Sequence, residues 1–207
     1  MLIMSLDRQS LNNPSDEIQI HSSNKTRLAC LGDSITELSG YPNHAKHTLG
    51  DSYIVENFGA CGTTISLDSE NPYFHSRAFI QAKEFQPDIA VVMLGTNDAS
   101  PNFEGSTNRF IADYLELLDA LKSFMSNPKI WVVSPPHIFD EAWLSGHVMC
   151  TQVIPAVDEA SKLAHLPLID VYSAVDKPEL FFDGVHPNDE GAKIIAKVIC
   201  QTIISTE

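Results

Sequence analysis

The sequence predicts an α/β fold, a three-layer α/β/α sandwich around a five-stranded parallel sheet. Short apolar runs rich in β-branched residues alternate with longer segments of helical periodicity, and this strand-then-helix unit repeats five times. Parallel strands need long crossover connections, and helices in those crossovers cover both faces of the sheet. The chain of 207 residues is long enough to bury a sizeable core without disulfide bonds.

Five apolar runs bounded by polar or glycine-containing turns are the expected strands. They cover residues 27–31, 53–57, 89–94, 130–134 and 168–172. The third run, Ile-Ala-Val-Val-Met-Leu, is continuously apolar, which is typical of a strand that is buried on both faces.

The expected helices lie between and after these strands, at residues 41–49, 76–85, 108–125, 147–164 and 189–204. Within the third helix, apolar residues recur at steps of three and four, and Asp113, Glu116 and Asp119 fall between them. This spacing predicts a helix with an apolar stripe on the sheet and acidic residues outside the stripe. Pro155 lacks a backbone N–H and is expected to bend or restart the fourth helix.

The two ends of the chain differ in character. Residues 1–25 are polar and aperiodic, which predicts an N-terminal arm, and residues 26–207 are expected to form one domain. The start of the chain shows no cationic region followed by an apolar core, so a cytoplasmic location is expected. No run approaches the roughly 18 apolar residues of a membrane span.

The charge of the chain excludes some classes of partner. With 27 acidic and 13 basic residues, the formal net charge is −14, which argues against nucleic acid or an anionic membrane as a partner. A small neutral substrate is favoured instead. The four cysteines, Cys30, Cys61, Cys150 and Cys200, lack the close spacing of zinc or redox motifs and are expected to be free thiols. The sequence makes no prediction of oligomeric state.

A serine, an aspartate and a histidine stand at positions that suit acyl transfer. Ser34 follows the first strand in the run Gly-Asp-Ser-Ile, and Asp183 and His186 lie three residues apart near the other end of the chain. A serine hydroxyl becomes a good nucleophile when an imidazole takes its proton, and a carboxylate orients that imidazole. One turn of backbone is enough to place Asp183 beside His186, so tertiary folding has to supply only the contact with Ser34.

Two further segments offer donors for the negative charge that develops on an ester carbonyl oxygen. Gly62 lies in a glycine-bearing turn after the second strand, where a backbone N–H can approach a ligand closely. Asn97 follows the third strand and carries a side-chain amide donor. Parallel sheets bind ligands at the carboxyl ends of their strands, and Ser34, Gly62 and Asn97 all follow such ends.

These blocks occur in the order found in the SGNH hydrolases, also called GDSL esterases and lipases, which the chain resembles at residues 32–36, 62, 95–98 and 183–188. The resemblance implies a flavodoxin-like SGNH hydrolase fold. It implies Ser34 as the nucleophile, His186 as general base and then acid, and Asp183 as its orienting partner. The oxyanion hole would be the N–H groups of Gly62 and Ser34 and the side chain of Asn97. No cofactor is required.

Other polar residues receive more modest roles. Asp33 and Asp98 are expected to hold their loops by accepting backbone hydrogen bonds. Tyr73, His75, Arg77 and His137 lie in or near loops that follow strands and are candidates for contact with substrate. The alternative for each is an ordinary surface or loop residue.

The substrate expected from the resemblance is a short-chain carboxylic ester. The segments 57–59, 71–73 and 93–98 are similar to the carbohydrate and sialate-type O-acetylesterases, which suggests O-acetyl groups on a sugar. No long apolar lid segment of a lipase is present. A thioesterase or lysophospholipase of the same fold is the alternative. Two further classes remain open: a metal-dependent phosphoesterase with Asp33, Asp98, Asp183 and His186 as ligands, and a sugar-binding domain without activity.

Overall fold

The computed structural model describes residues 25–103, 107–139 and 143–206, so the expected N-terminal arm lies almost wholly outside the described residues. A five-stranded parallel sheet forms its centre, in the order β2-β1-β3-β4-β5. The strands are β1 (Thr26–Gly32), β2 (Tyr53–Gly59), β3 (Ile89–Met93), β4 (Lys129–Val133) and β5 (Leu168–Ile169). This is the flavodoxin-like order, and it confirms the predicted α/β class.

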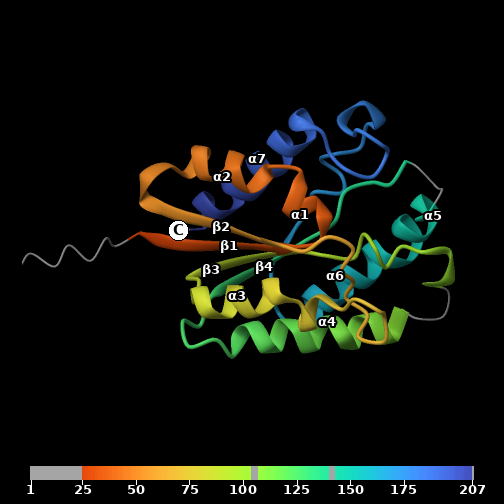
Figure 1. The fold of residues 1–207 in the computed structure, drawn as a ribbon, viewed down its shortest axis with the longest axis horizontal. Coiled ribbons are helices and arrows are strands. Elements are labelled where there is room, and N and C mark those ends of the chain that lie inside the picture. The colour runs from red at the N-terminus through yellow and green to blue at the C-terminus, as the bar shows by residue number, and fades with distance from the viewer. Residues whose placement is uncertain (1–24, 104–106, 140–142, 207) are drawn as a thin grey trace, which may run out of the picture.

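Seven helices in the described residues accompany the sheet: α1 (Ser34–Leu38), α2 (Tyr41–Leu49), α3 (Arg77–Phe85), α4 (Thr107–Lys122), α5 (Gly146–Val148), α6 (Ile154–Leu163) and α7 (Asp189–Ser205). Figure 1 shows α2 and α7 on one side of the sheet and α3, α4 and α6 on the other. Single 3-10 turns lie at Gly50–Ser52, Tyr73–His75, Pro101–Phe103 and Pro178–Leu180. The three layers therefore follow the prediction.

The alternation of side chains along β1 divides the core into two halves. Ala29 and Leu31 pack in the layer of α3, α4 and α6, whereas Leu28 and Cys30 pack in the layer of α2 and α7. All four side chains are fully buried, as expected for a central parallel strand. Burying one leucine side chain contributes about 1.5–3 kcal/mol to the free energy of unfolding. The buried side chains of β1 therefore stabilise the position at which the next loop begins.

The chain reverses its direction across the sheet between β1 and β3. From β1 it crosses to β2 at one edge, and from β2 it returns past β1 to β3. The loops after β1 and β3 therefore diverge at their carboxyl ends, which is where open parallel sheets bind ligands. Ser34 follows β1 and Asn97 follows β3, so both lie at this switch point.

Two predicted elements are shorter in the structure. The fifth strand ends at Ile169, because the Asp170 side chain accepts a hydrogen bond from the Ser173 N–H and starts a turn. The helix predicted over 147–164 is interrupted by a π-helical turn at Met149–Val153. The α6 helix then begins with Pro155 in its first turn, as the missing proline N–H predicts.

One predicted outer residue of the third long helix is buried. Asp113 is 4% exposed, because its carboxylate accepts hydrogen bonds from the Leu67 N–H and from Arg109. The expectation that Asp113 lies outside the stripe was therefore wrong. The apolar stripe itself, which includes Phe110, Leu117 and Leu121, faces the sheet as predicted.

Within the described part of the chain, none of the helices has both the length and the apolar character needed to cross a lipid bilayer. All four cysteines are free thiols, as expected.

Candidate active site

Ser34 is placed by a tight turn at the end of β1. Asp33 caps α1, because its Oδ1 accepts the Ile35 N–H at 2.9 Å, and Ser34 is the first residue of that helix. The turn has no room for a side chain at Gly32, where an added Cβ would lie 2.0 Å from the Thr36 Oγ1. The Ser34 side chain therefore stands at the carboxyl edge of the sheet, 7% exposed.

His186 faces Ser34 from the loop before α7. Its Nε2 lies 2.9 Å from the Ser34 Oγ, although 152 positions separate the two residues. Its Nδ1 lies 2.8 Å from the Asp183 Oδ2. A carboxylate on Nδ1 favours the tautomer that carries its proton there, which leaves Nε2 free to accept the serine proton. The structure thus brings together the three residues that the sequence suggested.

The carboxylate of Asp183 is held in place by the backbone that follows it. Its Oδ1 accepts the N–H groups of Val185, at 3.0 Å, and His186, at 2.8 Å. Partial burial raises the pKa of Asp183. The hydrogen bonds from the backbone and ring of His186 and from the Val185 N–H outweigh this effect, so that the net pKa is lowered to about 2. Asp183 is therefore charged at any neutral pH.

Asn97 is hydrogen-bonded to the residue that follows Gly62, although the two come from different loops. The Thr63 N–H donates to the Ala60 carbonyl, which closes a turn with Gly62 at a φ of +70°. The Asn97 Nδ2 donates to the Thr63 carbonyl at 2.8 Å. An amide nitrogen carries two hydrogens and this contact uses one of them. This hydrogen bond joins the loop after β3 to the loop after β2, beside Gly62.

Glu37 was missed by the sequence reasoning. It lies in α1, one turn after Ser34, and its Oε2 accepts the Cys61 N–H at 2.6 Å. The helix that carries Ser34 thus also holds the turn that carries Gly62. No motif marks such a contact, because a glutamate on a short helix is an ordinary surface residue.

Asp33 and Asp98 hold loops, as predicted. The two oxygens of Asp98 accept the N–H groups of Ile65 and Ser66, at 2.9 and 3.0 Å. Burial raises the pKa of Asp33 and of Asp98 to about 6 in each case, against the lowering effect of the hydrogen bonds that they accept. The two residues are 0% and 5% exposed, so both carboxyls are largely withdrawn from water.

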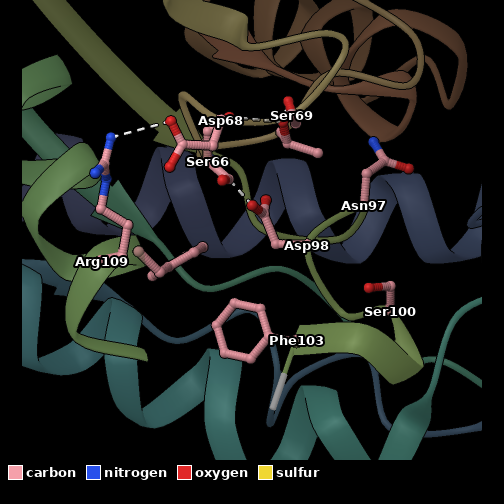
Figure 2. Close-up of a pocket in the computed structure, with 10 residues that line it drawn as sticks. Ser66, Asp68, Ser69, Asn97, Asp98, Ser100, Phe103 and Arg109 are labelled. Atoms are coloured by element: carbon pink, nitrogen blue, oxygen red, sulfur yellow. Dashed lines mark hydrogen bonds and ion pairs between the residues drawn. The ribbon is translucent and has the colours of Figure 1, made fainter. Parts of the chain in front are cut away.

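A polar pocket opens on one side of Asn97. It has a volume of about 530 Å³ and is lined by Thr64, Ser66, Asp68, Ser69, Asn97, Asp98, Ser100, Phe103, Arg109 and Phe110. Figure 2 shows Asp98 directed toward the loop of Ser66, and Arg109 directed toward Asp68. Most of the lining residues carry a hydroxyl or a charged group, and two, Phe103 and Phe110, are aromatic.

A second pocket opens on the other side of Asn97. It has a volume of about 370 Å³ and is lined by Asn97, Trp143, Leu144, Asp183, Val185 and His186. Its walls are mostly apolar, whereas its polar groups are those of the proposed catalytic centre. Asn97 is common to both pockets, so the proposed oxyanion donor stands between them.

The four weaker candidates for substrate contact line neither of these pockets. Tyr73 is fully buried and its hydroxyl donates to the Phe58 carbonyl, so it supports the core beneath the loop. His75 and Arg77 are exposed beside the start of α3. The ring of His137 stacks on that of Tyr172, with 3.7 Å between centroids, and burial lowers the pKa of this histidine.

The residues considered as metal ligands do not form a cluster. In residues 25–103, 107–139 and 143–206, no group of three or more histidine, cysteine, aspartate or glutamate side chains is arranged to hold a metal ion. The oxygens of Asp98 are already engaged by two backbone N–H groups.

Similar proteins of known sequence are esterases. The chain is 30% identical over 223 residues to an acetylxylan esterase of Xylanibacter ruminicola, covering 94% of this chain and 46% of that protein. It is also 30% identical over 121 residues to a multidomain esterase of Ruminococcus flavefaciens, covering 56% of this chain and 15% of that protein. The chain thus spans about half or less of the length of these relatives.

Solved structures share the fold. A carbohydrate acetylesterase family member from Sinorhizobium meliloti matches with a TM-score of 0.68 at 19% identity, over 87% of this chain and 98% of that one. The aryl esterase of M. smegmatis matches with a TM-score of 0.70 at 18% identity, over 87% and 99%. The model of the GDSL-like lipase/acylhydrolase family matches residues 30–194, which confirms the resemblance seen in the sequence. This chain belongs to the GDSL-like lipase/acylhydrolase family.

Proposed function

We propose that this protein is a serine esterase that hydrolyses short-chain carboxylic esters, with O-acetyl groups on a carbohydrate as its substrate class. The observation that carries the proposal is the continuous contact from the Ser34 Oγ to the His186 Nε2 and from the His186 Nδ1 to Asp183, at 2.9 and 2.8 Å. This is the arrangement that turns a hydroxyl into a nucleophile at neutral pH.

The mechanism follows from these positions. Ser34 attacks the ester carbonyl carbon while His186 takes the serine proton, and the new C–O bond gives a tetrahedral oxyanion. The C–O bond to the alcohol then breaks, and the alcohol leaves with the proton from His186. Water attacks the acyl-enzyme by the same route and releases the acid. Asp183 stays ionised and stabilises the imidazolium in both halves of the reaction.

The oxyanion would be held by Asn97 and by the backbone N–H groups of Gly62 and Ser34. The contact of Asn97 with the Thr63 carbonyl supports this role, because it fixes the amide beside the glycine turn before substrate arrives. Preorganised donors of this kind cost no reorganisation during the reaction and stabilise the transition state most effectively.

Two observations support a small acyl group on a sugar. Most residues that line the polar pocket beside Asn97 carry a hydroxyl or a charged group, which suits a small acyl group better than a long hydrocarbon chain. One relative, which matches 94% of this chain, is an acetylxylan esterase. The net charge of −14 also favours a neutral substrate over a polyanionic one.

The reaction class is tested by labelling with a fluorophosphonate, followed by mass mapping of the modified peptide. The proposal expects the adduct on the peptide that carries Ser34, and no adduct in the Ser34→Ala variant. The same variant should lose activity by about ten thousand fold or more. Near-normal activity of a folded Ser34→Ala variant would rule out this mechanism.

The substrate class is tested with a panel of four compounds: 4-nitrophenyl acetate, a long-chain 4-nitrophenyl ester, an acetylated xylo-oligosaccharide and an acyl-CoA. We expect turnover of the acetate esters and little of the long-chain ester. Preference for the acyl-CoA would instead support the thioesterase alternative.

A further inference from the structure

Trp143 is the most conspicuous apolar side chain at the proposed active site. It is 84% exposed, whereas Trp131, the other tryptophan of the chain, is 4% exposed in the core. Exposing an indole to water has a cost in free energy, and a ligand that covers the indole would remove this cost. Trp143 lines the pocket that also contains His186.

The chain that follows Trp143 is anchored by hydrogen bonds of Ser145. The Ser145 N–H donates to the Ala99 carbonyl at 2.6 Å, and the Ser145 Oγ accepts the Val148 N–H at the start of α5. Trp143 thus stands two residues before an anchor on the loop that carries Asn97.

The pocket wall beside Trp143 is packed against the protein core. Leu144 and Val185, which line the pocket with it, are partly buried and pack against the core layer that contains α4 and α6. The exposed indole adds a flat apolar surface to this wall.

The chemistry decides which half of the ester enters this pocket. In the proposed reaction, His186 must give its proton to the oxygen of the departing alcohol. The alcohol therefore lies near the His186 Nε2, and of the two pockets beside Asn97 only the one with Trp143 is lined by His186. The acyl group lies on the other side of the carbonyl, away from the imidazole.

We propose that Trp143 is the binding platform for the sugar that carries the ester, and that it determines specificity for the alcohol half of the substrate. This inference rests on the proposed esterase function. A pyranose ring has a face of C–H groups, and covering the exposed indole with this face removes apolar surface of both partners from water. The hydroxyl groups at the edge of the ring remain in contact with water.

The first test compares two substrates that share the acetyl group. An acetylated xylo-oligosaccharide reaches the platform, whereas ethyl acetate has an alcohol too small to cover it. We expect Trp143→Ala to lower kcat/KM for the sugar ester by about tenfold more than for ethyl acetate, mainly through KM. Trp143→Phe, which keeps an aromatic face, should recover most of this selectivity.

Met125→Ala is the matched control, because Met125 is 91% exposed and follows α4 rather than lining the pocket. This variant should leave both substrates unaffected. An equal loss on the two substrates in Trp143→Ala, or no loss on the sugar ester, would overturn the platform while leaving the esterase function intact. A wild-type enzyme that hydrolyses neither ester would overturn the proposed function and the platform together.

A binding measurement tests the platform without turnover. Because Trp131 is buried, the exposed indole dominates any change in tryptophan emission on contact with solutes. We expect the emission of the Ser34→Ala variant to shift on titration with the acetylated xylo-oligosaccharide, and the shift to vanish in Ser34→Ala with Trp143→Phe. Absence of a shift at saturating sugar ester, or its persistence in the double variant, would contradict the proposal.

Discussion

The Oε2 of Glu37 accepts a hydrogen bond from the Cys61 N–H at 2.6 Å, which joins the helix of Ser34 to the turn of Gly62. The two proposed donors on the backbone, at Ser34 and Gly62, are thus linked through one side chain. A charged acceptor makes this bond stronger than a neutral one. The link suggests that the nucleophile and the oxyanion turn are positioned together.

Replacement of Glu37 should therefore affect turnover although it takes no part in the proposed chemistry. We expect Glu37→Ala to lower kcat on 4-nitrophenyl acetate by about tenfold, less than the loss of a direct oxyanion donor, because the turn is loosened rather than removed. Glu37→Gln retains an oxygen acceptor and should recover most of the activity. The control is Glu84→Ala, at an exposed position of α3. Equal activity of Glu37→Ala and the control would contradict the role.

Asn97 is predicted to act in the transition state. Asn97→Ala should lower kcat by about a hundredfold to a thousandfold with a smaller change in KM, since the lost donor faces charge that develops only during the reaction. Asn97→Asp should be at least as damaging, because a carboxylate offers no donor and repels an oxyanion. Asn43→Ala, at an exposed position in α2, is the control. Asn97→Ala also removes the hydrogen bond to the Thr63 carbonyl, which could destabilise the fold. Thermal melting of the variant therefore shows whether the loss of kcat is due to unfolding.

Asp183 is predicted to matter equally across the neutral pH range. Asp183→Asn should lower kcat/KM by about a hundredfold to ten thousandfold, because the carboxylate that orients the imidazole is lost. With the pKa of Asp183 lowered to about 2, the carboxylate is charged at pH 6 and at pH 8, so the ratio of wild type to variant should be similar at both. A folded Asp183→Asn variant that keeps nearly wild-type kcat/KM would contradict the role of the carboxylate. Asp119→Asn, at an exposed residue of α4, is the control.

The sequence was sufficient to predict the layers of the fold and the contact among Ser34, His186 and Asp183. Continuous apolar runs reveal buried parallel strands, and the ends of those runs locate the loops that meet at the switch point. Ser34 follows β1, an inner strand of the sheet, and folding brings the His186 Nε2 within 2.9 Å of its hydroxyl.

Contacts made by ordinary surface residues were not predictable. Glu37 and Asp113 have the composition and spacing of solvated helix positions, yet each accepts a backbone hydrogen bond from the loop after β2. Such bonds depend on where a loop passes, and loop paths leave no periodic signal in the sequence. Trp143 was missed for the same reason, since only the pocket shows that it lies beside His186.

The stability of the protein should depend on pH through its buried carboxyls. The pKa of Asp98 is raised to about 6 from an ordinary 3.8, chiefly by burial, and that of Asp33 is raised in the same way. Between about pH 4 and pH 6 the folded protein then holds protons that the unfolded chain releases. The contribution of these groups to the free energy of unfolding is therefore largest near pH 4, and it is lost as the pH rises through about 6.

Asp98→Asn isolates this effect, because an amide does not titrate. The variant should be destabilised by about 1–3 kcal/mol at pH 4, since its NH2 group cannot accept one of the N–H bonds from Ile65 and Ser66. As the pH rises from 4 to 7, wild type loses the contribution of the protonated Asp98 and the variant does not, so the difference between them should shrink. Urea unfolding at pH 4, 5, 6 and 7 measures this difference. A difference that grows with pH would mean that the hydrogen bonds to Asp98 favour its charged form more than burial disfavours it.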